Sequence, residues 1–187
     1  MTKNIIKKKD NLIKLLEDIF SYLRLKFHSS NSVGFFCENN YIFQYLKPYI
    51  EKKSKKKIVI IISFEEIKFE NQKNIKLYIF KTNFFREVVF LTLNLKILYS
   101  STPDLNNTIF KKSKFSNCKY IYLQHAPVSL TMVYNAKAFD AFDAVQTINT
   151  FQYDEMRQIK AIKNLNTKVF RGKYLYLSDY KSNKENY

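Results

Sequence analysis

The fold is indicated most clearly by the stretch Lys57-Ile-Val-Ile-Ile-Ile62, a run of β-branched residues with no polar alternation. A run of this kind is typical of a strand covered on both faces, as strands in parallel sheets are. Helical patterns occupy residues 41–53, 84–93 and 151–162. We therefore predict an α/β fold with a single Rossmann-like, doubly wound, mainly parallel sheet. The other expected strands lie at residues 33–37, 75–80, 95–99, 119–124, 144–148 and 168–170.

An amphipathic helix is predicted at residues 10–27, where Leu, Ile and Phe recur at steps of three and four. Asp10 is placed to cap its start. Two interpretations remain open. The apolar side packs on the domain's own core, or the helix, preceded by Lys7-Lys8-Lys9, lies on an anionic membrane surface. The opposite, polar side is expected to carry Lys14, Glu17, Asp18 and Arg24.

The chain is expected to hold one folded domain. We assign residues 1–30 to the basic amphipathic helix, residues 31–178 to the Rossmann-like domain, and residues 179–187 to a polar tail. No internal repeat and no linker rich in Pro, Gly or Ser interrupts this order.

The charge is strongly basic, with 32 Lys and Arg against 16 Asp and Glu and a net charge of +16. Such a chain should attract anionic lipid headgroups, polyphosphates and nucleotides. Only four of the basic residues are Arg, however, and a Lys-rich chain is also what an AT-rich genome encodes. Since base recognition favours the planar Arg fork and no recognised reading motif is present, nucleic acid is disfavoured as a partner.

The composition excludes several site classes. The chain has two glycines, Gly34 and Gly172, so a glycine-rich phosphate loop cannot be built. Its two cysteines, Cys37 and Cys118, are far apart and lack metal-ligand spacing. We therefore expect no metal site and no cofactor, and a reducing, cytoplasmic location. No apolar run approaches the length of a membrane span, which leaves a soluble or peripheral protein.

His125 is the leading candidate for chemistry, because it follows the predicted strand 119–124 directly. Ligands of doubly wound sheets bind beyond the carboxyl ends of the strands. There a neutral imidazole can accept a proton from a hydroxyl. The alternative is a hydrogen-bonded structural histidine, which is what we expect of His28 at its helix end. Candidate binding residues beside His125 are Gln124, Ser129 and Thr131.

The stretch Tyr120-Ile-Tyr-Leu-Gln-His-Ala-Pro-Val-Ser129, followed by Tyr134 and by Ala138-Phe-Asp-Ala-Phe-Asp143, resembles a known family. It is similar to the N-terminal half of the CDP-glycerol glycerophosphotransferases, the teichoic-acid polymerases and primases. These enzymes have a GT-B fold and are related to other surface-polysaccharide transferases. The resemblance covers about residues 119 to 157, and the segment Arg171-Gly-Lys-Tyr174 resembles the end of the family's acceptor domain. Two departures are Ala126, where glycine or serine is usual, and a Gly172 segment without proline.

The resemblance implies that His125 is the general base that deprotonates an acceptor hydroxyl. It also matches Asp140 and Asp143 to the family's Phe-Asp element, and Glu155 to an acidic residue of the next helix. These three are therefore expected to bind substrate in one site with His125 and the residues beside it. The residues themselves allow other roles. An Asp before a strand often caps or orients a turn, and Glu155 can be a solvated helix residue.

The resemblance further implies an acceptor-side domain that transfers glycerophosphate or a sugar to a lipid-linked or polymeric acceptor at the inner membrane face. The nucleotide-activated donor, CDP-glycerol or a nucleotide sugar, would be held by a C-terminal domain or a partner chain. The chain ends where that domain is expected, so the isolated chain is expected to be inactive. The alternative is a non-catalytic basic domain that binds anionic membrane lipid or nucleic acid.

Overall fold

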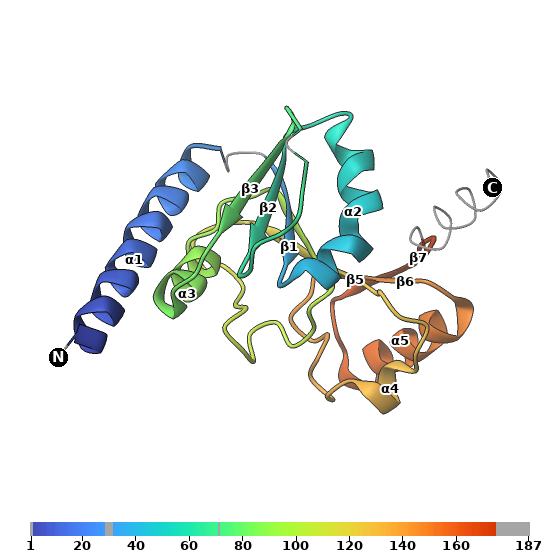
Figure 1. Ribbon diagram of the computed structural model, residues 1–187. Coiled ribbons are helices and arrows are strands. Elements are labelled where there is room, and N and C mark those ends of the chain that lie inside the picture. The colour runs from blue at the N-terminus through green and yellow to red at the C-terminus, as the bar shows by residue number, and fades with distance from the viewer. Residues whose placement is uncertain (1, 29–31, 71, 175–187) are drawn as a thin grey trace, which may run out of the picture.

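The computed structural model describes residues 2–28, 32–70 and 72–174, and the predicted polar tail lies outside them (Figure 1). Seven parallel strands form one sheet in the order β3-β2-β1-β4-β5-β6-β7. The predicted α/β class with a single Rossmann-like parallel sheet is therefore confirmed. The strands are β1 (Val33–Cys37), β2 (Val59–Ser63), β3 (Ile75–Ile79), β4 (Ile97–Ser100), β5 (Lys119–Leu123), β6 (Ala144–Thr147) and β7 (Lys168–Arg171).

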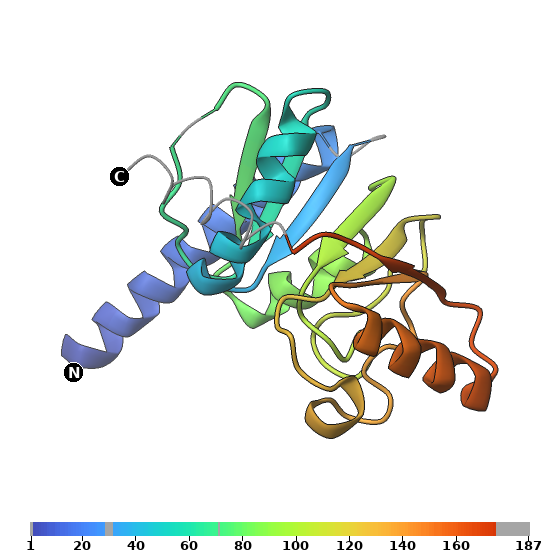
Figure 2. The same cartoon turned by 90° about the vertical axis from the view of Figure 1, so that its right-hand side faces the viewer.

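Helices lie on both faces of the sheet, as Figures 1 and 2 show. One face of β1 and β2 packs against α2, with Phe35, Ile61 and Leu46 in this core. The other face packs against α1, α3, α4 and α5, and its core includes Phe36 and Tyr120. The cores divide in this way because successive strand residues point to opposite faces. The helices are α1 (Thr2–His28), α2 (Asn40–Ser54), α3 (Asn83–Leu91), α4 (Leu130–Val133) and α5 (Thr150–Lys163).

The order in which the chain adds strands to the sheet reverses between β1 and β4. From β1 the chain proceeds to β2 and β3, and it then returns through α3 to β4 and continues to β7. The carboxyl ends of β1 and β4 therefore diverge at a topological switch point, which is where such sheets place their ligands. Asn39 caps α2 at this point by accepting a hydrogen bond of 3.0 Å from the Ile42 backbone N–H.

Helix α1 is docked in an unexpected orientation. Asp18, predicted on the solvent side, is fully buried, whereas Phe20 is 66% and Phe27 is 87% exposed. The Asp18 carboxylate accepts backbone N–H bonds of 2.9 Å from Lys81 and 2.8 Å from Thr82, at the start of α3. The expectation that the apolar side packs on the core is thus wrong for most of the helix. The polar cap at α3 decides the orientation instead.

Two further contacts hold α1 to the domain. Leu25 is buried in the core, and the Tyr22 hydroxyl lies 2.9 Å from the Thr92 hydroxyl beyond α3. The first part of the helix extends beyond the sheet (Figure 1). Within the residues that the structure describes, no helix has both the length and the apolar composition needed to cross a membrane.

We expect Asp18→Ala to lower the free energy of unfolding by about 1–2 kcal/mol, because the backbone N–H groups of Lys81 and Thr82, just before α3, lose their acceptor. Asp10→Ala, at an exposed carboxylate of the same helix, is the matched control and should change it by less than about 0.5 kcal/mol. Urea denaturation followed by circular dichroism measures both values. Equal effects of the two substitutions would show that the cap does not hold α1.

Candidate functional site

His125 lies where the structure brings three segments together at the carboxyl edge of the sheet. It follows β5, and its ring meets the Tyr45 ring of α2 edge-on, with centroids 5.5 Å apart. Tyr174, which follows β7, stacks on Tyr45 at 6.3 Å and donates a hydroxyl hydrogen bond of 2.9 Å to the His125 carbonyl. The imidazole therefore stands one strand from the switch point, enclosed by aromatic side chains.

The ring of His125 is partly buried, and its Nδ1 atom is buried with no hydrogen-bond partner among the described residues. Burial lowers the pKa of His125, since desolvation disfavours the charged imidazolium. The imidazole is therefore neutral at pH 7 and able to accept a proton. A cavity of about 10 Å³ adjoins it, which is the scale of one water molecule or one hydroxyl group. Its lining is Tyr45, Leu46, Tyr49, Ser101, Leu123, Gln124, His125 and Tyr174.

Two side chains of α5 hold the loop that carries His125. The Gln152 amide donates hydrogen bonds of 2.8 Å to the carbonyls of both Ala126 and Val128. The Glu155 carboxylate accepts 2.6 Å and 2.8 Å bonds from the Ser129 hydroxyl and the Leu130 N–H. Gln152 is fully buried and Glu155 is 9% exposed, so these bonds form away from water. Helix α5 thus determines the path of the chain after β5.

The structure brings the predicted residues Gln124, Ser129, Thr131 and Glu155 near His125, but it pairs them with protein groups. Glu155 also accepts the Thr131 hydroxyl at 3.0 Å, and Gln124 donates 2.8 Å to the Ala126 carbonyl. The alternative of a solvated Glu155 is wrong. These contacts make the four residues supports of the loop, and their role toward a substrate stays a prediction.

The pKa of Glu155 is set by opposing effects. Burial raises it, whereas hydrogen bonds from the Ser129 hydroxyl, the Leu130 N–H and Thr131 lower it, and the net result is a lowered pKa. The carboxylate is therefore ionised at neutral pH. It lies as a negative group at the start of the short helix α4, whose N-cap residue is Ser129.

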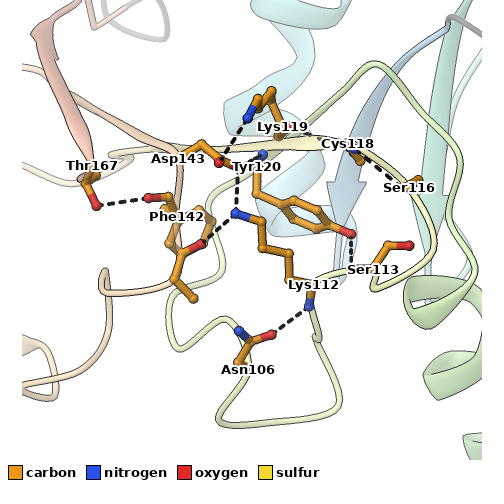
Figure 3. A network of polar contacts seen from close by, with 11 residues as sticks. Asn106, Lys112, Ser113, Ser116, Cys118, Lys119, Tyr120, Phe142, Asp143 and Thr167 are labelled. Atoms are coloured by element: carbon orange, nitrogen blue, oxygen red, sulfur yellow. Dashed lines mark hydrogen bonds and ion pairs between the residues drawn. The ribbon is translucent and has the colours of Figure 1, made fainter. Parts of the chain in front are cut away.

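Asp140 and Asp143 lie at the other edge of the sheet from His125. Asp143 directly precedes β6, whereas His125 follows β5, and the two strands are parallel. Asp143 accepts the Tyr120 N–H at 2.8 Å and pairs with Lys112 at 2.8 Å (Figure 3). This corrects the expectation of one shared site: the aspartates and His125 are at opposite ends of the strands.

Both aspartates have structural partners there. Burial raises the pKa of Asp143, but the Lys112 ammonium and the Tyr120 N–H outweigh it, so the pKa is lowered. Asp140 pairs with Lys163 of α5 at 2.8 Å. The other interpretation of these residues, that an Asp before a strand orients the local chain, agrees with these contacts.

The switch point itself does not resemble a pyrophosphate site. Glu38 and Asn39 stand between β1 and α2, where dinucleotide-binding sheets have a glycine-rich loop. The Glu38 carboxylate lies 3.4 Å from the Thr102 hydroxyl beyond β4. A negative side chain at this position opposes an anionic ligand. Within residues 9–28, 32–70 and 72–174, no three His, Cys, Asp or Glu side chains are grouped to hold a metal ion.

Sequence reasoning missed the contributions of Tyr45, Gln152 and Gly172. A Cβ atom on Gly172 would lie 2.2 Å from the Gln146 side chain, so a larger residue there would push that side chain aside where the chain passes from β7 to Tyr174. A lone glycine after a strand was the available signal for this close approach. Gln152 and Tyr45 offered no signal, because their partners are distant in the chain.

We expect Glu155→Gln to reduce the free energy of unfolding by about 1–3 kcal/mol at pH 7, because a neutral amide accepts these buried bonds more weakly. The lowered pKa gives the sign of the pH effect. The stabilisation is present above the unfolded-state pKa and is lost as pH falls through the folded-state pKa. The difference from wild type should therefore shrink in acid. Urea denaturation between pH 7 and pH 3 measures it, with exposed Asp154→Asn on the same helix as the control. If the difference in unfolding free energy between wild type and Glu155→Gln did not change with pH, Glu155 would not be the ionised acceptor described above.

Comparison of the chain with protein-family models, with curated proteins and with solved structures finds no match. Any assignment of function therefore depends on the residues and the geometry described above.

Proposed function

We propose that this chain is the acceptor-side domain of a surface-polymer transferase, similar to the CDP-glycerol glycerophosphotransferases, with His125 as its general base. The observation that carries the proposal is the unpartnered, buried Nδ1 of a neutral imidazole at the carboxyl edge of a parallel sheet. Leaving a buried nitrogen without a hydrogen bond is costly, and an incoming hydroxyl group would relieve that cost. Tyr45 and Tyr174, which enclose the ring, would have to move apart to admit an acceptor.

The proposed reaction is a displacement at an activated phosphate. The acceptor hydroxyl gives its proton to the imidazole of His125, and its oxygen forms a bond to the glycerol-bearing phosphorus of CDP-glycerol. The bond from that phosphorus to CMP breaks, and CMP leaves with the electron pair. With a nucleotide sugar, the oxygen bonds to the anomeric carbon and a nucleoside diphosphate leaves.

The donor is proposed to bind elsewhere. Glu38 at the switch point and the lack of a glycine-rich loop oppose a diphosphate in the usual Rossmann position. A second domain, on the same polypeptide or on a partner chain, would hold the CDP-glycerol or nucleotide sugar. This division leaves His125 and its aromatic neighbours to orient the acceptor.

The test measures transfer from labelled CDP-glycerol to a poly(glycerol phosphate) acceptor. We expect no turnover by residues 1–187 alone, and turnover when a donor-binding domain is supplied. His125→Gln should then lower the rate by at least about 100-fold, because proton transfer to a base is lost. His28→Gln is the control, since the partners of the His28 ring among the described residues are structural groups, the Arg24 carbonyl and the Tyr78 hydroxyl. Full activity of His125→Gln would overturn the proposal.

The variant His28→Gln also shows whether His125 is catalytic or merely structural, through the pH dependence of its NMR signals and of the transfer rate. With only two histidines, proton NMR of His28→Gln reports His125 alone, and we expect its pKa to lie below the ordinary value. The transfer rate should fall as pH drops through that value. An acceptor that binds beside the ring should shift the His125 signals, whereas a merely structural histidine would not respond.

Location at an anionic membrane surface is the second part of the proposal, and the exposed side of α1 supports it. Leu12, Leu16, Phe20 and Leu23 are between 48% and 66% exposed and recur at steps of three and four. Exposed Lys9 and Lys14 belong to the same helix. An apolar stripe with basic neighbours is typical of a helix that lies in a bilayer interface. This feature also fits the alternative function, a basic domain that binds anionic lipid without catalysis.

Binding to vesicles tests the helix. We expect the protein to bind vesicles that contain phosphatidylglycerol more tightly than vesicles of phosphatidylcholine. Leu16→Ser with Phe20→Ser should weaken binding at least about tenfold, since two apolar side chains no longer enter the interface. Phe151→Ser, at an exposed position of α5, is the matched control. His125→Gln should leave vesicle binding unchanged. Equal binding by all variants would remove α1 as the membrane contact.

A further inference from the structure

Among the residues that the structure describes, one face of the sheet is only partly covered over strands β4 to β7, although Leu123 and Gln146 on this face are buried, at 2% and 8% exposed. It presents Ile97, Tyr99, Ile121, Leu123, Gln146 and Phe170, which we call the open face. Ile97, Tyr99 and Ile121 are only partly buried, and Phe170 is 39% exposed. These side chains point away from the core that contains α3, α4 and α5.

The topology explains why this face lacks a cover. The connections after β4, β5 and β6 contribute Leu105, Phe139 and Met156 to the core on the other face. Helix α2 covers β1 and β2 on the open side, and the core beneath it reaches as far as Leu123 of β5, with Tyr99 and Ile121 packed at its border. No other described helix packs there. Parallel sheets are normally covered on both faces by helices, so the open face is an unfilled position in the usual arrangement.

Two hollows occupy the open face, one after the other along β4 and β5. The first has a volume of about 540 Å³ and includes Ile97 and Ile121. The second has a volume of about 440 Å³ and includes Tyr99 and Leu123, each two residues further along its strand. Because residues two apart share a strand face, the hollows form one continuous apolar strip.

The rim of the strip is basic. Five exposed lysines line the hollows: Lys52, Lys53, Lys119, Lys168 and Lys173. The Lys53 ammonium lies 5.6 Å from the centre of the Tyr99 ring, over the apolar floor. The acidic residues of the lining, Asp140 and Asp143, already pair with lysines. Of the five rim lysines, Lys119 pairs with Asp143 at 3.6 Å. No ion pair among the described residues involves the other four, so the strip combines an apolar floor with four unpaired positive charges at its edges.

This charge selects among possible occupants. A second copy of the chain would bring the same lysine rim and a net charge of +16, so self-association across this face is repulsive. Residues 175–187 contain two lysines, one aspartate and one glutamate, and thus offer no net charge to match the rim. The complementary occupant is a helix that is apolar on one side and acidic on its flanks.

We propose that the open face of β4 to β7 is a docking surface for an acidic amphipathic helix supplied by another polypeptide. Its apolar side packs on Tyr99, Ile121 and Phe170, which completes the second layer of the sheet. Its carboxylates meet the lysines of the rim.

The probe is a labelled amphipathic peptide of about 18 residues, roughly five helical turns, with Leu on one side and Glu on the other. A second peptide has every Glu replaced by Lys. Fluorescence anisotropy with the full chain at physiological salt should detect binding of the Glu peptide only. Hydrogen exchange of the complex should show protection in β5 and β7.

Two pairs of variants locate the contact. Phe170→Asp should weaken binding of the Glu peptide at least about tenfold, because it replaces an apolar contact by a like charge, whereas Phe151→Asp on α5 should change it less than about twofold. The double change Lys53→Glu and Lys173→Glu should have the same effect as Phe170→Asp. Lys55→Glu with Lys56→Glu, at exposed positions that do not line the hollows, is its control.

Each other occupant has a distinct result that overturns the proposal. A dimer in sedimentation that Phe170→Asp dissociates would identify a second copy. Removal of residues 175–187 that raises peptide affinity about tenfold would identify the chain's own end. Protection of β5 and β7 by phosphatidylglycerol vesicles instead of the peptide would identify a lipid surface. Equal binding of the Glu and Lys peptides, or equal effects of target and control variants, would exclude a docking site for an acidic helix.

Discussion

The position of the candidate base depends on the bonds between α5 and the loop after β5. Gln152 and Glu155 lie one helical turn apart. Gln152 donates hydrogen bonds to the carbonyls of residues 126 and 128, and Glu155 accepts them from residues 129 and 130. The loop is otherwise short of regular structure, with only the four-residue helix α4. Inside the loop, the Gln124 amide bonds to the Ala126 carbonyl and the Ser129 hydroxyl caps α4, and the bonds from α5 add the buried contacts that tie the loop to the next helix. His125 is therefore oriented indirectly, by a helix that follows the next strand.

The general architecture could be predicted because it depends on local patterns. Apolar strands without alternation, such as 59–62, indicate a sheet buried on both faces, and the helical periods between them indicate parallel crossovers. The position of His125 at a carboxyl edge followed from the same reasoning. The location of Asp143 at the opposite edge could also have been predicted from the sequence, since a residue just before a parallel strand lies at the amino edge of the sheet. The family resemblance had placed the two residues in one site, and strand polarity separates them.

Other features could not be predicted because they depend on partners far along the chain. Asp18 is buried because the turn before α3, some 64 residues later, presents the backbone N–H groups of Lys81 and Thr82 to it. The periodicity of α1 alone favours the reverse orientation. Glu155 and Gln152 are similar cases, with partners 24 to 26 residues away. In each case a buried polar contact outweighs the simple rule that polar residues face solvent.

The exposed apolar side of α1 and the open face of β4 to β7 lie on different sides of the sheet. Helix α1 contacts β3 and α3 on one face of the sheet, at one end of the strand order. The open face lies on the other side of the sheet, toward β7 at the opposite end. A bilayer at α1 and a helix at β4 to β7 would therefore not compete for space. The carboxyl edge with His125 adjoins the open face, since Tyr49 and Leu123 line both the second hollow and the cavity at His125. A helix docked on that face would therefore lie close to Tyr45 and Tyr174, the side chains that must move apart to admit an acceptor.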